Sequence, residues 1–437
     1  QPDIKYLQGE VMSNLTRRNF GKLALATSVL ALTGANSTKA AGRIRHFWWG
    51  NKERDKRTYA TIDAFNAAFS DSTVVGETLG WRDYWPKMAT QVAGKNMADV
   101  IQMDYRYIAE YARRGAIKSL NSHLDSRAID MSDFAQFSFD GGTVDGQVYG
   151  VNIGTNSQFV PYDKTLLDQL GLTFDPYKWN WDEFVKISRE VTKNTPDGIY
   201  GSVNNGGQEV WLDIWLRQKN KALYHENGDL AFDQKDIEEY WSFWVDCQET
   251  GVSWPATEEA ASTSMAKSGI PTKKTAFDSY WTNQIVAIQK LTDHQIEMAT
   301  IPHNPGDSPG MYYKCGQFIS MSRDTQDESL SAKYMNFFIR DPRAVGILKL
   351  ERGVPGTKEM RDFLKPGYSR EEAIMVEYLE GIEGRTKKLP PVPPKGAGEI
   401  DRAFERYWEG VAFGKTKIAS AAKSFYREAE RIRRKQG

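Results

Sequence analysis

The chain is poor in the residue types that build disulfide scaffolds, metal sites and common catalytic centres. Only two cysteines, Cys247 and Cys315, occur among its 437 residues, which excludes a disulfide framework. One disulfide and two free thiols are both compatible with this pair. The five histidines are scattered, with no HExxH motif and no metal-ligand spacing. A GxSxG motif, a P-loop and a dinucleotide fingerprint are also missing, so we expect no metal, no cofactor and no enzyme of these classes.

An excess of charge of either sign is lacking as well. The chain has 57 Lys and Arg residues and 57 Asp and Glu residues, and acidic residues slightly outnumber basic ones beyond residue 40. Without a basic excess there is no electrostatic reason to bind nucleic acid or an anionic membrane. We expect neither as a partner.

The first forty residues have the features of an export signal. Arg17 and Arg18 precede a short apolar run, residues 23–35, and small side chains precede a cleavage point after Ala40. The apolar run is shorter than the ~20 residues that a membrane span needs, and no cysteine follows it that could carry a lipid. The paired arginines resemble the twin-arginine class of signals. We therefore expect a signal peptide over residues 12–40, cleaved near Ala40, and a mature protein in the periplasm.

Aromatic residues are abundant, in contrast to the features above. The chain has 13 Trp, 20 Tyr and 20 Phe, and every tryptophan lies beyond residue 40. Planar side chains with a polar tip suit the apolar faces of pyranose rings. Most of these residues are nevertheless expected in the core, so the composition favours a sugar ligand without identifying its site.

Strand-like and helix-like patterns alternate along the mature chain. Strands are predicted at residues 44–49, 73–79 and 100–103. Between and after them, helices are predicted at 59–69, 83–93 and 107–114. Alternation of this kind predicts α/β layers around a largely parallel sheet. A mature chain of this length is too long for one compact core and suits two lobes.

Eight short segments occur in an order that is characteristic of one family. Residues 94–104 resemble the family's G-x-x-P-D-V stretch, with Ala98 in place of the proline. The other segments are residues 47–51, 62–66, 146–151, 162–164, 178–184, 274–281 and 352–357. Together they resemble the family 1 extracellular solute-binding proteins, the carbohydrate-binding partners of ABC importers, which are related to maltose-binding protein. The resemblance covers essentially the whole mature chain.

This resemblance implies a two-lobe periplasmic binding protein fold of α/β class, type II-like, with lobes joined by hinge crossings. The protein would be a monomer that closes on a sugar or oligosaccharide and delivers it to an ABC transporter permease. The crossings are expected in segments rich in small or polar residues, at 154–157, 314–317 and 353–356. The expected lobes are residues 41–154 plus 318–354 and residues 155–313 plus 355–437.

The site residues follow from the strand ends and from the resemblance. Ligands of open α/β sheets bind beyond the carboxyl ends of the strands, and the resemblance adds positions in the opposite lobe and at the crossings. The strand ends give Trp49, Asn51, Trp81, Asp104 and Tyr105. The resemblance and the crossings give Asn156, Gln208, Trp211, Trp281, Tyr313 and Arg352.

Several of these residues have a structural alternative. Asp104 is also placed to cap the helix that follows it, and Trp211 has apolar neighbours at helical spacing that suit a core position. Trp48 and Trp49 point to opposite sides of a strand, so only one of them faces the site.

Two other functions remain open at this point. An exported carbohydrate hydrolase or lyase needs two facing carboxylates, and 57 acidic residues do not exclude such a pair. A metal- or iron-binding protein has only Tyr312 and Tyr313 in its favour, and adjacent strand residues point apart.

Overall fold

The structure is a computed structural model, and it describes residues 42–436. The predicted signal peptide, including Arg17 and Arg18, lies outside the described residues. None of the helices within the described range is both long and apolar enough to cross a membrane. Cys247 and Cys315 are buried free thiols, and burial raises the pKa of both.

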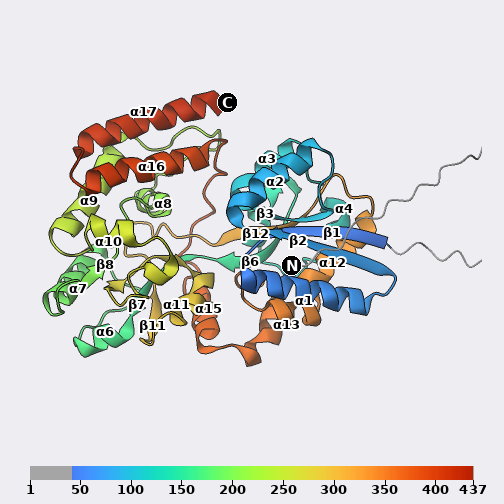
Figure 1. The fold of residues 1–437 in the computed structure, drawn as a ribbon, viewed down its shortest axis with the longest axis horizontal. Coiled ribbons are helices and arrows are strands. Elements are labelled where there is room, and N and C mark those ends of the chain that lie inside the picture. Colours follow the sequence, from blue (N-terminus) through green and yellow to red (C-terminus); the bar gives the residue numbers. More distant parts are fainter. Residues whose placement is uncertain (1–41, 437) are drawn as a thin grey trace, which may run out of the picture. The chain divides into compact units, whose positions relative to one another are not determined.

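The first of two main sheets has the strand order β2-β1-β3-β12-β6 (Figure 1). Its first three strands are parallel, whereas β12 runs antiparallel to both β3 and β6. The strands are β1 (Gly42–Trp49), β2 (Ser72–Leu79), β3 (Val100–Asp104), β6 (Val151–Asn156) and β12 (Lys314–Met321). The three predicted strands are confirmed, and distant segments add β6 and β12, of which only β12 runs opposite to the other strands.

Helices cover both faces of this sheet. On one face, Trp48 and Phe65 pack with Tyr334, whereas Trp49 packs with Tyr84 on the other face, because neighbouring strand residues point to opposite sides. The helices of this half are α1 (Lys52–Ala68), α2 (Trp81–Ala93), α3 (Tyr105–Arg113), α4 (Asn121–Asp125), α5 (Phe137–Asp140), α12 (Glu328–Arg340) and α13 (Pro342–Leu348). A small hairpin, β4 (Thr143–Val144) and β5 (Gln147–Val148), lies between α5 and β6.

The second sheet has the order β10-β7-β9-β8, with β11 also paired to β7. Only β8 and β9 are parallel, and β7 is antiparallel to its three neighbours. The expectation of largely parallel sheets is therefore wrong for this half, because most of its neighbouring strands run in opposite directions. The strands are β7 (Gln158–Asp163), β8 (Tyr200–Ser202), β9 (Thr275–Phe277), β10 (Tyr280–Trp281) and β11 (Ile296–Ala299).

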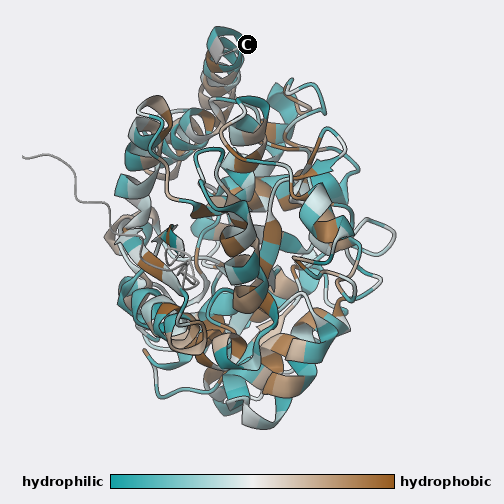
Figure 2. Ribbon diagram, turned by 90° about the vertical axis from the view of Figure 1, so that its right-hand side faces the viewer, coloured by the Kyte–Doolittle hydropathy of each residue, from teal (hydrophilic) through white to brown (hydrophobic). Residues whose placement is uncertain are grey.

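An aromatic core surrounds the second sheet. It contains the buried indoles of Trp179, Trp181, Trp211, Trp241 and Trp244, so much of the aromatic content serves packing. Hydrophobic and hydrophilic residues alternate along the helices, as expected for helices with one buried face (Figure 2). The helices of this half are α6 (Lys164–Gln169), α7 (Trp181–Lys193), α8 (Glu209–Gln218), α9 (Gln234–Glu249), α10 (Ala256–Ala261), α11 (Ile285–Gln289), α14 (Lys358–Leu364), α15 (Arg370–Gly381), α16 (Ala397–Ala412) and α17 (Ile418–Gln436). Short 3₁₀ turns are η1 (Met265–Lys267), η2 (Thr282–Gln284) and η3 (Lys365–Gly367).

The three segments predicted as crossings lie side by side between the sheets. Thr155 pairs with Cys315, and its backbone N–H donates to Val354 O at 2.8 Å. A side chain at Gly353, which has φ +125°, would place its Cβ 2.6 Å from Asn156 Nδ2. Only glycine allows so close an approach at this backbone angle.

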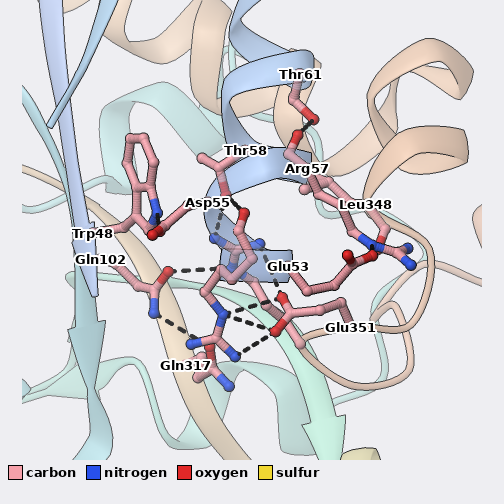
Figure 3. A network of polar contacts seen from close by, with 12 residues as sticks. Trp48, Glu53, Asp55, Arg57, Thr58, Thr61, Gln102, Gln317, Leu348 and Glu351 are labelled. Atoms are coloured by element: carbon pink, nitrogen blue, oxygen red, sulfur yellow. Dashed lines mark hydrogen bonds and ion pairs between the residues drawn. The ribbon is translucent and has the colours of Figure 1, made fainter. Parts of the chain in front are cut away.

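A buried polar network attaches the third crossing to the first sheet (Figure 3). The guanidinium of Arg352 donates to Gln102 Oε1 at 3.2 Å and to Thr58 Oγ1 at 2.9 Å. The neighbouring Glu351 forms an ion pair of 2.9 Å with Arg54 on α1. Both side chains of this ion pair are largely buried, so removing one partner would leave an uncompensated charge.

Candidate functional site

A cavity of about 300 Å³ brings together four of the predicted residues, Trp81, Asp104, Tyr105 and Trp281. We call it the central cavity. Asp104 is the last residue of β3, and Tyr105 and Trp81 follow β3 and β2, as the strand-end rule predicts. Trp281 ends β10 of the second sheet. The cavity is thus lined from both sheets.

Local hydrogen bonds hold the first-sheet side of the central cavity. Asp104 caps α3, because its Oδ1 accepts from Arg106 N at 2.9 Å. The Tyr105 hydroxyl donates to Pro390 O at 2.5 Å, and it thereby fixes the proline-rich segment 390–394 against the cavity. Trp81 remains 41% exposed, so its ring is open to solvent. The capping alternative for Asp104 is therefore confirmed, and the same side chain also lines the cavity.

Several lining residues were not predicted from the sequence. Glu209 directly follows a predicted site residue, and Lys314 is the first residue of the second predicted crossing. Both therefore lie next to a segment that the sequence had already indicated. The prolines lie in segment 390–394, for which no binding role was predicted. The lining residues missed are Arg106, Glu209, Val210, Asp213, Leu223, Tyr224, Tyr312, Lys314, Pro390, Pro391, Pro393 and Ala397.

Charged groups of both signs line the central cavity. The guanidinium of Arg106 lies 3.9 Å from Glu209 Oε2, and Lys314 Nζ lies 4.4 Å from the centroid of the Trp281 ring. Burial, followed by repulsion from Asp401, raises the pKa of Glu209 to about 8. Burial also lowers the pKa of Lys314. Both ionised forms are therefore destabilised by loss of water in this cavity.

Two buried polar atoms at this cavity have no partner. Asp213 Oδ1 and the Tyr224 hydroxyl lack a hydrogen-bond partner among residues 42–436, although both side chains are buried. Burial raises the pKa of Asp213 to about 6. Leaving such groups unpaired costs about 1–3 kcal/mol each.

Trp49 and Asn51 do not line the central cavity. Trp49 is 7% exposed, and its ring packs edge-to-face with that of Trp81, with the ring centroids 5.1 Å apart. Trp49 therefore supports a residue that lines the cavity. Asn51 caps α1 and accepts from the backbone N–H groups of Glu53 and Arg54 at 3.0 Å each. The structure gives them supporting and capping roles, and the prediction that they bind the ligand directly stays a prediction.

Asn156 and Arg352 belong to the crossings and do not line the central cavity. Asn156 Nδ2 donates to Arg352 O at 3.0 Å, and its Oδ1 accepts from Thr282 Oγ1 and Asn283 N at 3.1 Å each. Arg352 is 3% exposed and its guanidinium is engaged in the buried network. These polar groups already have protein partners, and direct contact of either residue with the ligand stays a prediction.

The remaining predicted residues lie elsewhere in the second half. Trp211 is 4% exposed and packs with Trp181 and Trp244, so the core alternative is confirmed. Tyr313 stacks on Phe137 at 4.7 Å, and its hydroxyl donates to a backbone carbonyl at 2.7 Å. Packing accounts for both side chains, and their predicted ligand contacts stay predictions. Gln208 is exposed and lines a separate hollow.

The metal-binding alternative gains no support from the described residues. Within residues 42–436, no group of three or more His, Cys, Asp or Glu side chains is placed to hold a metal ion. Tyr312 lines the central cavity, whereas Tyr313 does not. The two adjacent tyrosines thus point to different places, as the strand geometry predicts.

Comparisons with known proteins agree with the architecture. Residues 60–376 match a family described as bacterial extracellular solute-binding protein. A solved extracellular solute-binding protein family 1 from Alicyclobacillus acidocaldarius is 26% identical, has a TM-score of 0.75, and is matched over 90% of this chain and 99% of that chain. A periplasmic oligogalacturonide-binding protein from Yersinia enterocolitica, in complex with saturated digalacturonic acid, is 21% identical with a TM-score of 0.79, over 90% and 99% of the two chains. The predicted two-lobe α/β fold is confirmed.

A curated relative is similar over a shorter region. A lactose-binding protein from Rhizobium radiobacter is 27% identical over 225 residues, which is 50% of this chain and 50% of that protein. The chain therefore spans about half the length of the curated relative that it matches.

Proposed function

The chain belongs to the bacterial extracellular solute-binding proteins, and we propose that it captures a sugar or oligosaccharide between its two lobes for an ABC importer. The observation that carries this proposal is the central cavity. The indoles of Trp81 and Trp281, one exposed and one half-buried, line it from different sheets. Carboxylates and two cationic side chains complete the lining. Indole rings cover the apolar face of a sugar, while charged groups accept or donate hydrogen bonds to its hydroxyls. The protein would then deliver the bound sugar to a membrane permease.

The lobes are proposed as residues 41–154 plus 318–354 and residues 155–313 plus 355–437, which rotate about the three crossings. Support comes from the pairing of Thr155 with both Cys315 and Val354, which concentrates the connections in one narrow region. Asn156 joins two crossings through Arg352 O. A few backbone rotations in this region would move one sheet relative to the other.

We also propose that the protein is exported as a folded monomer through the twin-arginine route and that its signal peptide is cleaved near Ala40. Support comes from Arg17 and Arg18 before the apolar run. The family description as extracellular agrees with a location outside the cytoplasm, and we propose the periplasm. The protein would act by binding, without a chemical step.

A thermal-shift panel of neutral, acidic and oligomeric sugars tests this function. The mature chain from residue 41 is melted with each sugar, and the mixtures are afterwards analysed for products. A ligand at 100 times its Kd stabilises the fold by about 2.7 kcal/mol. We expect one sugar class to raise the melting temperature, with one-to-one binding and no product. Absence of a shift with every sugar would contradict the binding proposal, and release of products would support the hydrolase or lyase alternative.

A further inference from the structure

A groove of about 640 Å³ adjoins the central cavity. We call it the side groove. Three residues line both spaces, Arg106, Pro393 and Ala397. The walls of the side groove are α3 and the segments 226–228 and 392–398. Because α3 belongs to one proposed lobe and both segments belong to the other, the side groove lies in the same cleft as the central cavity.

Arg106 lies at the junction of the two spaces, and its donors are unused. Its guanidinium is 3.9 Å from Glu209 Oε2 and 4.0 Å from Asp401 Oδ2, and both distances exceed that of a hydrogen bond. Among residues 42–436, none accepts a hydrogen bond from this guanidinium, although its side chain is 34% exposed. A guanidinium has five N–H donors, so Arg106 can donate to ligand hydroxyl groups on both sides of the junction.

Aromatic rings continue from the central cavity into the side groove. Trp81 lines the cavity, Tyr107 lines the groove, and their ring centroids are 6.2 Å apart. One face of Tyr107 stacks on Trp85, with the centroids 3.9 Å apart. This stacking holds the ring in place, and the half-buried side chain keeps the rest of its surface for a ligand. A sugar next to the one at Trp81 would therefore meet a second aromatic surface.

A proline-rich wall is shared by the two spaces. Segment 390–394 contributes residues to both the central cavity and the side groove. The Tyr105 hydroxyl, which donates to Pro390 O at 2.5 Å, anchors this segment. Proline fixes the backbone φ angle, so the wall loses little conformational freedom when a ligand binds. The apolar proline rings also suit the mostly apolar lining of a small-molecule site.

The charges of the side groove do not favour an ionic ligand group. Arg114 forms an ion pair of 2.8 Å with Glu110, and Arg113 forms one of 3.2 Å with Asp145. Apart from the arginine at the junction, the other charged lining residues are one of each sign, Glu226 and Lys395. The groove therefore suits a ligand part that carries hydroxyl groups.

We propose that the preferred ligand is an oligosaccharide that extends from the central cavity past Arg106 into the side groove, where a further sugar ring contacts Tyr107. The central cavity, at about 300 Å³, is at the lower end of the ~300–1,000 Å³ that is usual for ligand sites. The side groove supplies the additional space for a longer ligand. This inference rests on the proposed sugar-binding function, and it assigns the selection of chain length to the side groove.

Calorimetric titration with oligomers of increasing length tests the inference. The probes are glucose, galactose and galacturonic acid, and their 1,4-linked oligomers of two to four units. For the sugar that binds, a further stacked ring and further hydrogen bonds predict roughly tenfold tighter binding of the tetrasaccharide than of the disaccharide. Equal or weaker binding of the tetrasaccharide would overturn the inference and leave the sugar-binding function intact. Failure of every probe to bind would overturn both.

Three variants locate the selection of chain length. Tyr107→Ala removes the aromatic surface, whereas Glu226→Trp places a large side chain in the groove from an exposed turn, so the second remains informative if the first folds poorly. Each should lower the ratio of tetrasaccharide to disaccharide affinity by about tenfold. Tyr59→Ala truncates a 41% exposed tyrosine of α1 that lines neither space and should retain the ratio. A wild-type ratio in both Tyr107→Ala and Glu226→Trp would overturn the assignment to the side groove.

Discussion

Replacing Asp104 by asparagine separates the two roles that this side chain has in the structure. Its carboxylate caps α3 by accepting from Arg106 N at 2.9 Å, and it also lines the central cavity. Asparagine caps helices about as well as aspartate, so Asp104→Asn should keep the stability of the free protein. Loss of a charged acceptor for a sugar hydroxyl costs about 1.5–3 kcal/mol, or roughly ten- to a hundredfold in affinity.

Asp104→Ala provides the matched comparison. Removing the cap as well should lower the free energy of unfolding by about 1 kcal/mol, in addition to the loss of affinity. Both variants are titrated by calorimetry with the sugar found in the thermal-shift panel, and their ligand-free melting curves are recorded. Wild-type affinity in Asp104→Asn would show that Asp104 serves only as a cap, and the ligand role derived from the cavity would be refuted.

Three further predictions concern packing, protonation and export. Trp211→Ala should lower the free energy of unfolding by about 3–5 kcal/mol, whereas Trp281→Ala should mainly reduce sugar affinity. Calorimetric titration and melting curves of both variants check this. A stable Trp211→Ala with reduced affinity, or an unstable Trp281→Ala with normal affinity, would contradict the assigned roles. Because the pKa of Glu209 is raised to about 8 from 4.5, the folded state holds the extra proton and loses stability as pH rises through this window. The melting-temperature advantage of Glu209→Gln over wild type should therefore grow from pH 5 to pH 8, and a constant difference would contradict the assigned shift. Replacing Arg17 and Arg18 by two lysines should leave unprocessed protein in the cytoplasm, as detected by cell fractionation, whereas normal processing would favour the general secretory route.

Sequence patterns located much of the first sheet and its helices because their signals are local. The apolar spacing of α1, for example, appears within seventeen consecutive residues, and Phe65 is fully buried as that spacing predicts. The second sheet was harder to predict, because β7 pairs with β9, β10 and β11 from much later in the chain. Period-two patterns do not reveal which strands become neighbours.

The site was predicted where strand ends alone determine it. Asp104 and Trp81 line the central cavity because Asp104 ends β3 and Trp81 follows β2. The contact of Asn156 with the third crossing was not predicted, because its partner Arg352 lies 196 positions away and no local pattern indicates that contact. The same limit applies to Tyr105 and Pro390, which are joined across 285 positions. For polar residues near a strand end, only the tertiary contacts distinguish a role in ligand binding from a role in supporting the hinge.

Small-angle scattering with and without saturating sugar tests the central claim most directly. The claim is that a sugar binds between two lobes, which then close by rotation about the paired crossings at Thr155, Cys315 and Val354. The mature protein is measured free, with the sugar identified by thermal shift, and with a sugar that gives no shift. The account predicts a smaller radius of gyration only with the binding sugar. An unchanged radius at saturation would contradict closure between the lobes.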